Sequence, residues 1–198
     1  MKRLLSILLI GILTINTFTY ATNVDNSSNT PVQSTLAKKI KDLFENNDLF
    51  IALFDGKKIN EIVKEVVEQI STKDKEEAIR DYPQLSFDLS NFDTEYSTYS
   101  WLAEFTKTMI TEAIKKEHLT QEMIDKMNIS LQEIGISTFN ITIHKDMSDT
   151  EIELLCEQIV DLIQILTNNE TLRRVGIDLN DPELIESWRK SISDSMQK

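Results

Sequence analysis

Apolar residues recur at the period of an α-helix through almost all of the chain after Ser34, and this pattern limits the fold more than any other feature of the sequence. The clearest example is 57–71, where aliphatic side chains fall at steps of three and four on one face and charged side chains occupy the other. The aliphatic positions are Ile59, Ile62, Val63, Val66, Val67 and Ile70. With only 4 Gly and 3 Pro in 198 residues, little interrupts the pattern. The sequence therefore predicts a mainly all-α fold.

Helix-start signals accompany this pattern. Ser34 and Thr120 can cap the helices that follow them, and Ser148 with Glu151 forms a capping box. Behind that box, 149–167 has the widest apolar face, which places it at the centre of a bundle. We expect an irregular bundle of six to seven helices. The predicted helices cover about 34–45, 57–71, 74–82, 94–117, 120–134, 149–167 and 181–193.

Two short segments each have more than one interpretation. Leu49–Phe54 is an apolar run that could form a buried helical turn or a short strand, because periodicity cannot decide over so few residues. In 139–143, Phe139, Ile141 and Ile143 alternate with polar residues, as in a half-buried strand. This second segment either forms a short β-hairpin, with 49–54 as the best internal partner, or pairs with another protein, or is an extended connection.

The N-terminus has the three parts of a secretory signal peptide. A basic start at 1–3 precedes an apolar run at 4–13, and 19–21 ends in the small residue Ala21 that signal peptidases favour. The apolar run is shorter than the roughly 20 residues of a membrane-spanning helix. An uncleaved anchor is the alternative, but it would bury polar residues such as Asn16. The sequence therefore predicts a signal peptide over 1–21.

The rest of the chain divides into two parts. The polar segment 22–33 has too little apolar surface to offset the entropy of ordering, so we expect a flexible leader there. We expect 34–198 to form a single helical domain. The mature protein would begin near Thr22, in the periplasm or outside the cell.

The charge balance limits the partners. The chain has 33 Asp and Glu against 21 Lys and Arg, and its net charge is −12. Nucleic acid is an unsuitable partner, because binding phosphates requires a basic surface. We expect no stable membrane insertion after removal of the signal peptide, and association with an anionic membrane surface ranks last among the hypotheses. A protein partner is the hypothesis that remains, while its identity and the oligomeric state are left open.

Few residues point to catalysis. Cys156 has no partner for a disulfide and lies in an apolar helical stretch, so we expect a buried thiol that acts as a small hydrophobe. Neither His118 nor His144 lies in a zinc-binding pattern, and the chain has no Gly-x-Ser-x-Gly elbow. We therefore assign no catalytic, cofactor-binding or metal-binding residue, expect no cofactor, and favour a protein that is not an enzyme.

The one unusual local feature is a group of aromatic residues between the two halves of the chain. Such a group can attach a long connection to the core, or it can form a partly exposed recognition patch, because aromatic residues dominate binding hot spots. The candidate patch consists of Tyr82, Phe87, Phe92, Tyr96, Tyr99 and Trp101.

Our hypothesis from the sequence is an exported, non-enzymatic protein-binding factor, such as an inhibitor, adaptor or virulence-associated protein. The alternative is a small hydrolase of cell-wall or extracellular polymers that uses paired carboxylates.

Overall fold

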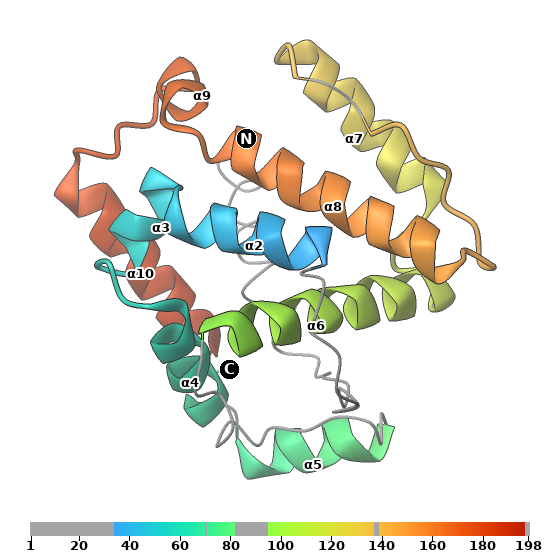
Figure 1. Cartoon of the computed structure of the whole chain (residues 1–198). Helices are drawn as coiled ribbons and strands as arrows, with labels where there is room; N and C mark the ends of the chain where they lie inside the picture. Colours follow the sequence, from blue (N-terminus) through green and yellow to red (C-terminus); the bar gives the residue numbers. More distant parts are fainter. Residues whose placement is uncertain (1–33, 70, 82–94, 137–138, 197–198) are drawn as a thin grey trace.

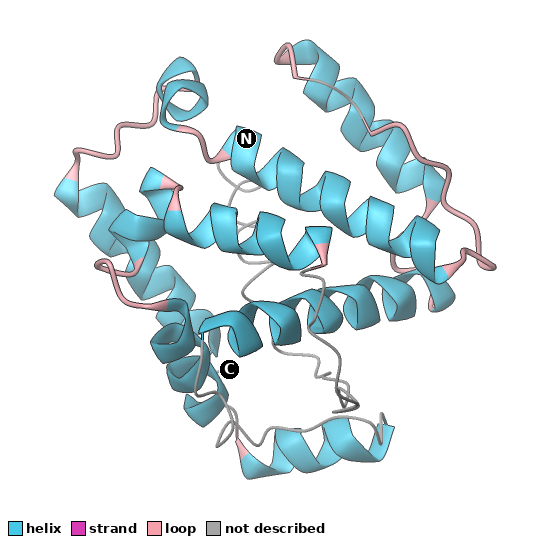
Figure 2. Cartoon of the chain, in the orientation of Figure 1, coloured by secondary structure: helices cyan, strands magenta, loops and turns pink. Residues whose placement is uncertain are grey.

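The structure, a computed structural model, describes residues 34–69, 71–81, 95–136 and 139–196. Within these ranges it contains nine helices and no strand, which confirms the mainly all-α prediction (Figure 1, Figure 2). The predicted signal peptide (1–21) and leader (22–33) lie outside the described residues. The helices are α2 (Thr35–Glu45), α3 (Asp48–Leu53), α4 (Ile59–Gln69), α5 (Thr72–Asp81), α6 (Glu95–Lys115), α7 (Gln121–Glu133), α8 (Asp149–Leu166), α9 (Asn169–Arg174) and α10 (Pro182–Met196).

The described residues thus contain more helices than the six to seven that we predicted. The difference comes from α3 and α9, which have six residues each. Both are too short to show a helical period in the sequence, and each depends on a side chain just before it. Asn47 caps α3, and Asn168 caps α9 by accepting a hydrogen bond from the N–H of Glu170 at 2.9 Å. Of the two alternatives for 49–54, the helical turn is confirmed and the strand was wrong.

The centre of the bundle is formed by α2, α6 and α8. In Figure 1, α2 lies between α8 above it and α6 below it, and both neighbours contact it extensively. The side chains that α2 buries lie on one face, and they are Leu36, Ala37, Ile40 and Leu43. Opposite them, α6 presents the buried Ala103 and α8 presents Leu155, which is fully buried. These side chains belong to one apolar cluster that also includes residues of α3, α4, α9 and α10.

Helix α8 is buried on two sides, as its wide apolar face predicted. Leu155 and Cys156 belong to the central cluster, whereas Leu162 and Leu166 belong to a second cluster with residues of α7. The capping box at its start is also confirmed, since the hydroxyl of Ser148 accepts a hydrogen bond from the N–H of Glu151 and the Glu151 carboxylate accepts the N–H of Ser148.

A buried polar contact joins the start of α3 to the end of α8. Asn47 is 4% exposed, and its side-chain carbonyl accepts hydrogen bonds from the N–H groups of Leu49 and Phe50 at 3.1 and 3.3 Å. Its amide donates to the hydroxyl of Thr167, which is 2% exposed. That hydroxyl in turn donates to the carbonyl of Ile163 at 2.6 Å. A single amide therefore caps one helix and holds the end of another.

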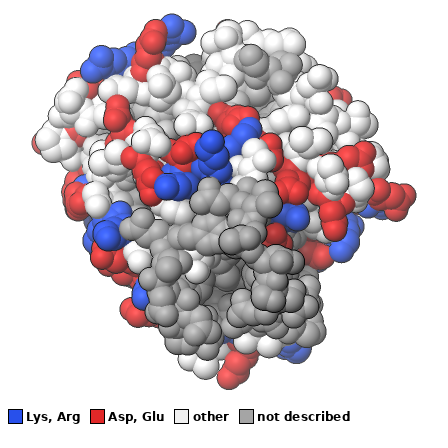
Figure 3. All heavy atoms as spheres, viewed as in Figure 1, with Lys and Arg blue, Asp and Glu red and all other residues white. Residues whose placement is uncertain are grey.

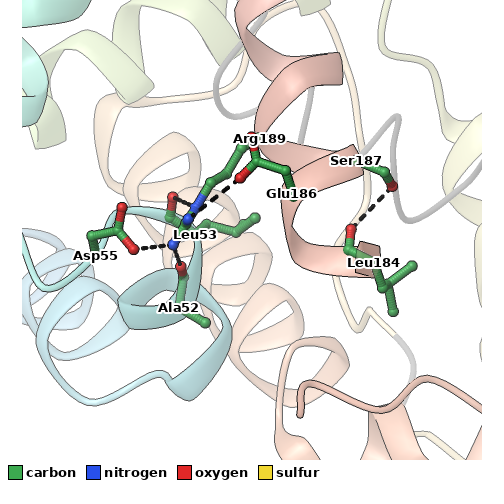
Figure 4. A network of polar contacts seen from close by, with 7 residues as sticks. All are labelled: Ala52, Leu53, Asp55, Leu184, Glu186, Ser187 and Arg189. Atoms are coloured by element: carbon green, nitrogen blue, oxygen red, sulfur yellow. Dashed lines mark hydrogen bonds and ion pairs between the residues drawn. The ribbon is translucent and has the colours of Figure 1, made fainter. Parts of the chain in front are cut away.

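Arg189 on α10 holds the opposite end of α3 (Figure 4). Its Nε donates to the carbonyl of Leu53 at 3.0 Å, and its Nη2 donates to the carbonyl of Ala52 and pairs with Asp55. The last carbonyls of a helix have no partner within the helix, so a guanidinium is well suited to bind them. Arg189 thereby fixes α10 against α3.

The segment at 139–143 is a connection and contains no strand. The N–H of Phe139 donates to Asn128 Oδ1 at 2.7 Å, and Asn128 Nδ2 donates to the carbonyl of Phe139 at 3.1 Å. The N–H of Ile143 donates to Gln121 Oε1 at 2.7 Å. Side-chain amides of α7 thus bind its backbone where a neighbouring strand would do so in a sheet. Of the alternatives for this segment, the β-hairpin with 49–54 is not formed, because 49–54 is helical.

The buried amide gives a stability prediction. Asn47→Ala removes the cap of α3 and the buried hydrogen bond to Thr167, so we expect a loss of about 2 kcal/mol in the free energy of unfolding. Asn46→Ala changes the exposed neighbour and should cost less than about 0.5 kcal/mol. Urea unfolding of the two variants measures the difference, and equal midpoints would contradict the structural role of Asn47.

Candidate functional site

A pocket of about 310 Å³ opens where α2, α3, α4 and α6 meet. Each helix contributes side chains, and the turn between α3 and α4 completes the wall. We call this site the aromatic pocket, and it is lined by Phe44, Glu45, Phe50, Ile51, Phe54, Gly56, Lys57, Lys58, Ile59, Ile62 and Tyr99.

Three phenylalanines form one wall of the aromatic pocket. The ring centroids of Phe44 and Phe50 lie 5.0 Å apart in an edge-to-face contact, and those of Phe50 and Phe54 lie 6.3 Å apart in a stacked one. Such pairs are stabilised by the ring quadrupoles in addition to the burial of apolar area. Phe50 is 1% exposed, which fixes its position, whereas Ile51 is 43% exposed. The pocket therefore has a rigid apolar wall with an accessible aliphatic side chain beside it.

The turn after α3 depends on backbone conformations that few residues adopt. Asp55 and Gly56 have φ values of 52° and 67°, in the left-handed region that glycine enters without steric cost. The N–H of Gly56 donates to the carbonyl of Ile51 at 3.2 Å. This turn redirects the chain into α4 and brings Ile59 and Ile62 to the pocket.

Three polar side chains of the aromatic pocket, Tyr99, Glu45 and Lys57, have partners within or beside it. The hydroxyl of Tyr99 donates to Glu45 Oε1 at 2.8 Å, and Glu45 Oε2 lies 3.7 Å from Lys41 Nζ. Lys57 binds both carboxylate oxygens of Glu65, at 2.7 and 2.8 Å. Glu45 is the one acidic side chain among the described residues that line the pocket.

The structure describes part of the predicted aromatic patch. Tyr99 is 4% exposed and faces the aromatic pocket, and Trp101 is half-buried and stacks on Phe105 with ring centroids 5.2 Å apart. Tyr96 lies on α6, but its side chain is not among those described. The remaining members, Tyr82, Phe87 and Phe92, lie outside the described residues, so the patch as a whole stays a prediction.

The sequence pattern alone does not mark the three phenylalanines as part of a site. Phe44 falls within the predicted helix 34–45, and Phe50 and Phe54 fall within the apolar run that could form a helical turn or a strand. The four-residue spacing of Phe50 and Phe54, following an Asn that can cap a helix, was the available signal. The contribution of Tyr99 depends on how α6 packs and has no signal in the sequence.

The groups with altered pKa values lie elsewhere. Burial raises the pKa of the Cys156 thiol to about 12. A hydrogen bond from Lys145 lowers the pKa of Glu117, and hydrogen bonds from Ser148 lower the pKa of Glu151. Hydrogen bonds from Asn180 lower the pKa of Asp178 in a turn before α10. Each of these three acids is exposed and its shift has a local structural cause.

No metal site or membrane-spanning helix is found in the part of the chain that the structure describes. No group of three or more His, Cys, Asp or Glu side chains gathers there so as to hold a metal ion. None of the described helices is both long enough and apolar enough to cross a bilayer.

The buried thiol gives a reactivity prediction. Because Cys156 is inaccessible and its pKa is about 12, native protein at neutral pH should react with a thiol reagent such as Ellman's reagent only as fast as it unfolds. The same protein in urea should react at once with one equivalent. Rapid labelling of native protein, with its circular dichroism spectrum unchanged, would show that the thiol is accessible.

Comparison of the chain with protein-family models, with curated proteins and with solved structures finds no match in any of the three.

Proposed function

We propose that this chain is an exported, non-enzymatic protein-binding factor, such as an inhibitor, adaptor or virulence-associated protein, and that the aromatic pocket binds its partner. The observation that carries the proposal is the pocket itself, with its rigid phenylalanine wall and the accessible Ile51. Preformed apolar concavities of this kind accept the large side chains that provide most of the energy of a protein interface.

The occupant that we propose is a large apolar side chain of the partner. A volume of about 310 Å³ is at the lower end of the range for small-molecule sites, and it suits one or two bulky side chains. The aromatic wall offers contact area without loss of side-chain entropy on binding, since Phe50 is already fixed by burial. The exposed Ile51 can extend the contact beyond the pocket.

The composition of the pocket favours binding over the alternative of polysaccharide hydrolysis. That chemistry uses two carboxyl groups about 5–10 Å apart on opposite sides of the bond that is cleaved. Among the described lining residues there is one acid, Glu45, and its carboxylate is engaged by the hydroxyl of Tyr99. The rest of the wall is largely aliphatic and aromatic.

The surface charge supports a protein partner over nucleic acid. The net charge is −12, and on the face drawn in Figure 3 the acidic and basic side chains lie interspersed. Binding to the phosphate backbone depends on a continuous basic surface that releases counterions.

The export part of the proposal rests on the sequence pattern of residues 1–21 and has its own test. We expect the mature protein to begin near Thr22 and to be recovered from the periplasm or the medium. Cell fractionation followed by N-terminal sequencing measures both. A chain that retains Met1 and stays in the cytosol would refute export and leave the pocket proposal untouched.

The pocket proposal predicts the effect of a charge beside it. A photo-crosslinking amino acid at position 51 identifies the partner, and the purified partner is then titrated against variants. Ile51→Glu should weaken binding about tenfold or more, because the carboxylate must be desolvated in the interface. Ile165→Glu is the matched control, since Ile165 on α8 is also 43% exposed but does not line the pocket.

The control should bind within about twofold of wild type. Equal affinity of both variants for the purified partner would contradict the pocket as the binding site. Occupation of the pocket by a small molecule that co-purifies with the protein would replace the protein partner by a ligand.

A further inference from the structure

The backbone of residues 139–144 has one side bound to α7 and one side without hydrogen bonds. Both hydrogen-bonding groups of Phe139 and the N–H of Ile143 are taken by side chains of α7. Within the described residues, no backbone group of Asn140 or Thr142 makes a hydrogen bond. One side of this segment is therefore hydrogen-bonded to the protein and the other is free to bind, a difference that the sequence alone does not reveal.

The contacts with α7 show that the segment is extended. Asn128 and Gln121 are seven positions apart on α7, which corresponds to about 10 Å along a helix. Their partners Phe139 and Ile143 are four positions apart, and four residues span about 13 Å in an extended strand but only about 6 Å in a helix. Residues 139–144 contain no helix or turn, and the two contacts spaced along α7 agree with an extended chain.

In an extended chain the backbone groups of successive residues point to opposite sides. Since the odd-numbered residues 139 and 143 point toward α7, the even-numbered ones point away from it. We call the backbone groups of Asn140, Thr142 and His144 the outer edge. Their side chains are exposed, and Figure 1 shows this part of the chain at the periphery of the molecule, between the end of α7 and the start of α8.

The segment is anchored firmly enough to keep this conformation. Phe139 is 8% exposed and packs with Ile124, Leu131, Leu162 and Leu166. At the other end, Lys145 pairs with Glu117. The outer edge is therefore held in place in the free protein, and its binding to another chain would require little ordering.

We propose that the outer edge binds an extended segment of a different protein by adding it as a β-strand. A row of N–H and C=O groups that repeats every two residues matches the backbone of another strand. The net charge of −12 opposes the approach of a second copy, so we assign the edge to a partner segment that is neutral or basic. This site is separate from the aromatic pocket and does not depend on the proposed function.

The test uses a phage-displayed library of random linear peptides selected on the full mature chain. Selected peptides should protect the amides of Asn140, Thr142 and His144 from hydrogen exchange. Methylation of the peptide's own backbone nitrogens, one at a time, should abolish binding at every second position, because only one side of a strand faces its neighbour.

Two variants at one position separate backbone from side-chain recognition. Thr142→Pro removes an N–H of the outer edge, and the φ angle of proline is compatible with an extended chain. It should weaken binding about tenfold, whereas Thr142→Ala, which keeps the N–H, should bind within about twofold of wild type. If the proline variant fails to fold, the methylation pattern of the peptides still decides the question.

Three results would overturn the proposal. The first is a selection that yields no peptide protecting these amides, and the second is an equal loss of affinity in both Thr142 variants. The third is protection of the same amides in a concentration-dependent dimer without peptide, which would make a second copy the occupant.

Discussion

The short helix α3 is fixed at both of its ends by contacts that reach residues in the C-terminal half of the chain, and the aromatic pocket depends on it. An isolated helix of six residues does not form in water, because nucleation costs more than so few hydrogen bonds return. Here Asn47 caps its start while bound to Thr167, and Arg189 binds its last carbonyls. These contacts hold the segment that places Phe50 and Phe54 in the pocket wall.

The second organising element is α8, which separates two apolar clusters. Its Leu155 and Cys156 complete the central cluster with α2 and α6, and its Leu162 and Leu166 support α7 and the extended segment. The aromatic pocket lies on the first side, and the outer edge belongs to the second. The two proposed binding sites share no residue, since the pocket is lined by α2, α3, α4, α6 and the turn between α3 and α4, and the extended segment follows α7.

The sequence predicted what depends on local pattern and missed what depends on distant contacts. The capping box at Ser148 and the wide apolar face of 149–167 identified the central helix, because both signals lie within one element. The segment 49–54 was too short to show a period. At 139–143 the apolar residues are more buried than the polar ones between them, as the alternation predicted. The hydrogen bonds to this backbone come from the side chains of Asn128 and Gln121, and no sequence pattern distinguishes these two positions in α7. The pocket is lined by residues as distant in the sequence as Phe44 and Tyr99, and only the packing of the helices brings them together.

The contacts that hold α3 also constrain the order in which the chain can fold. Asn47 and Thr167 are 120 positions apart, and Leu53 and Arg189 are 136 apart, so both contacts close very long loops. During synthesis the position of α3 would therefore be stabilised only after α8 and α10 had been made. Many translocation channels pass only unfolded polypeptides, and under the proposed export this late-closing topology would keep the nascent chain competent for translocation until its last helix had emerged.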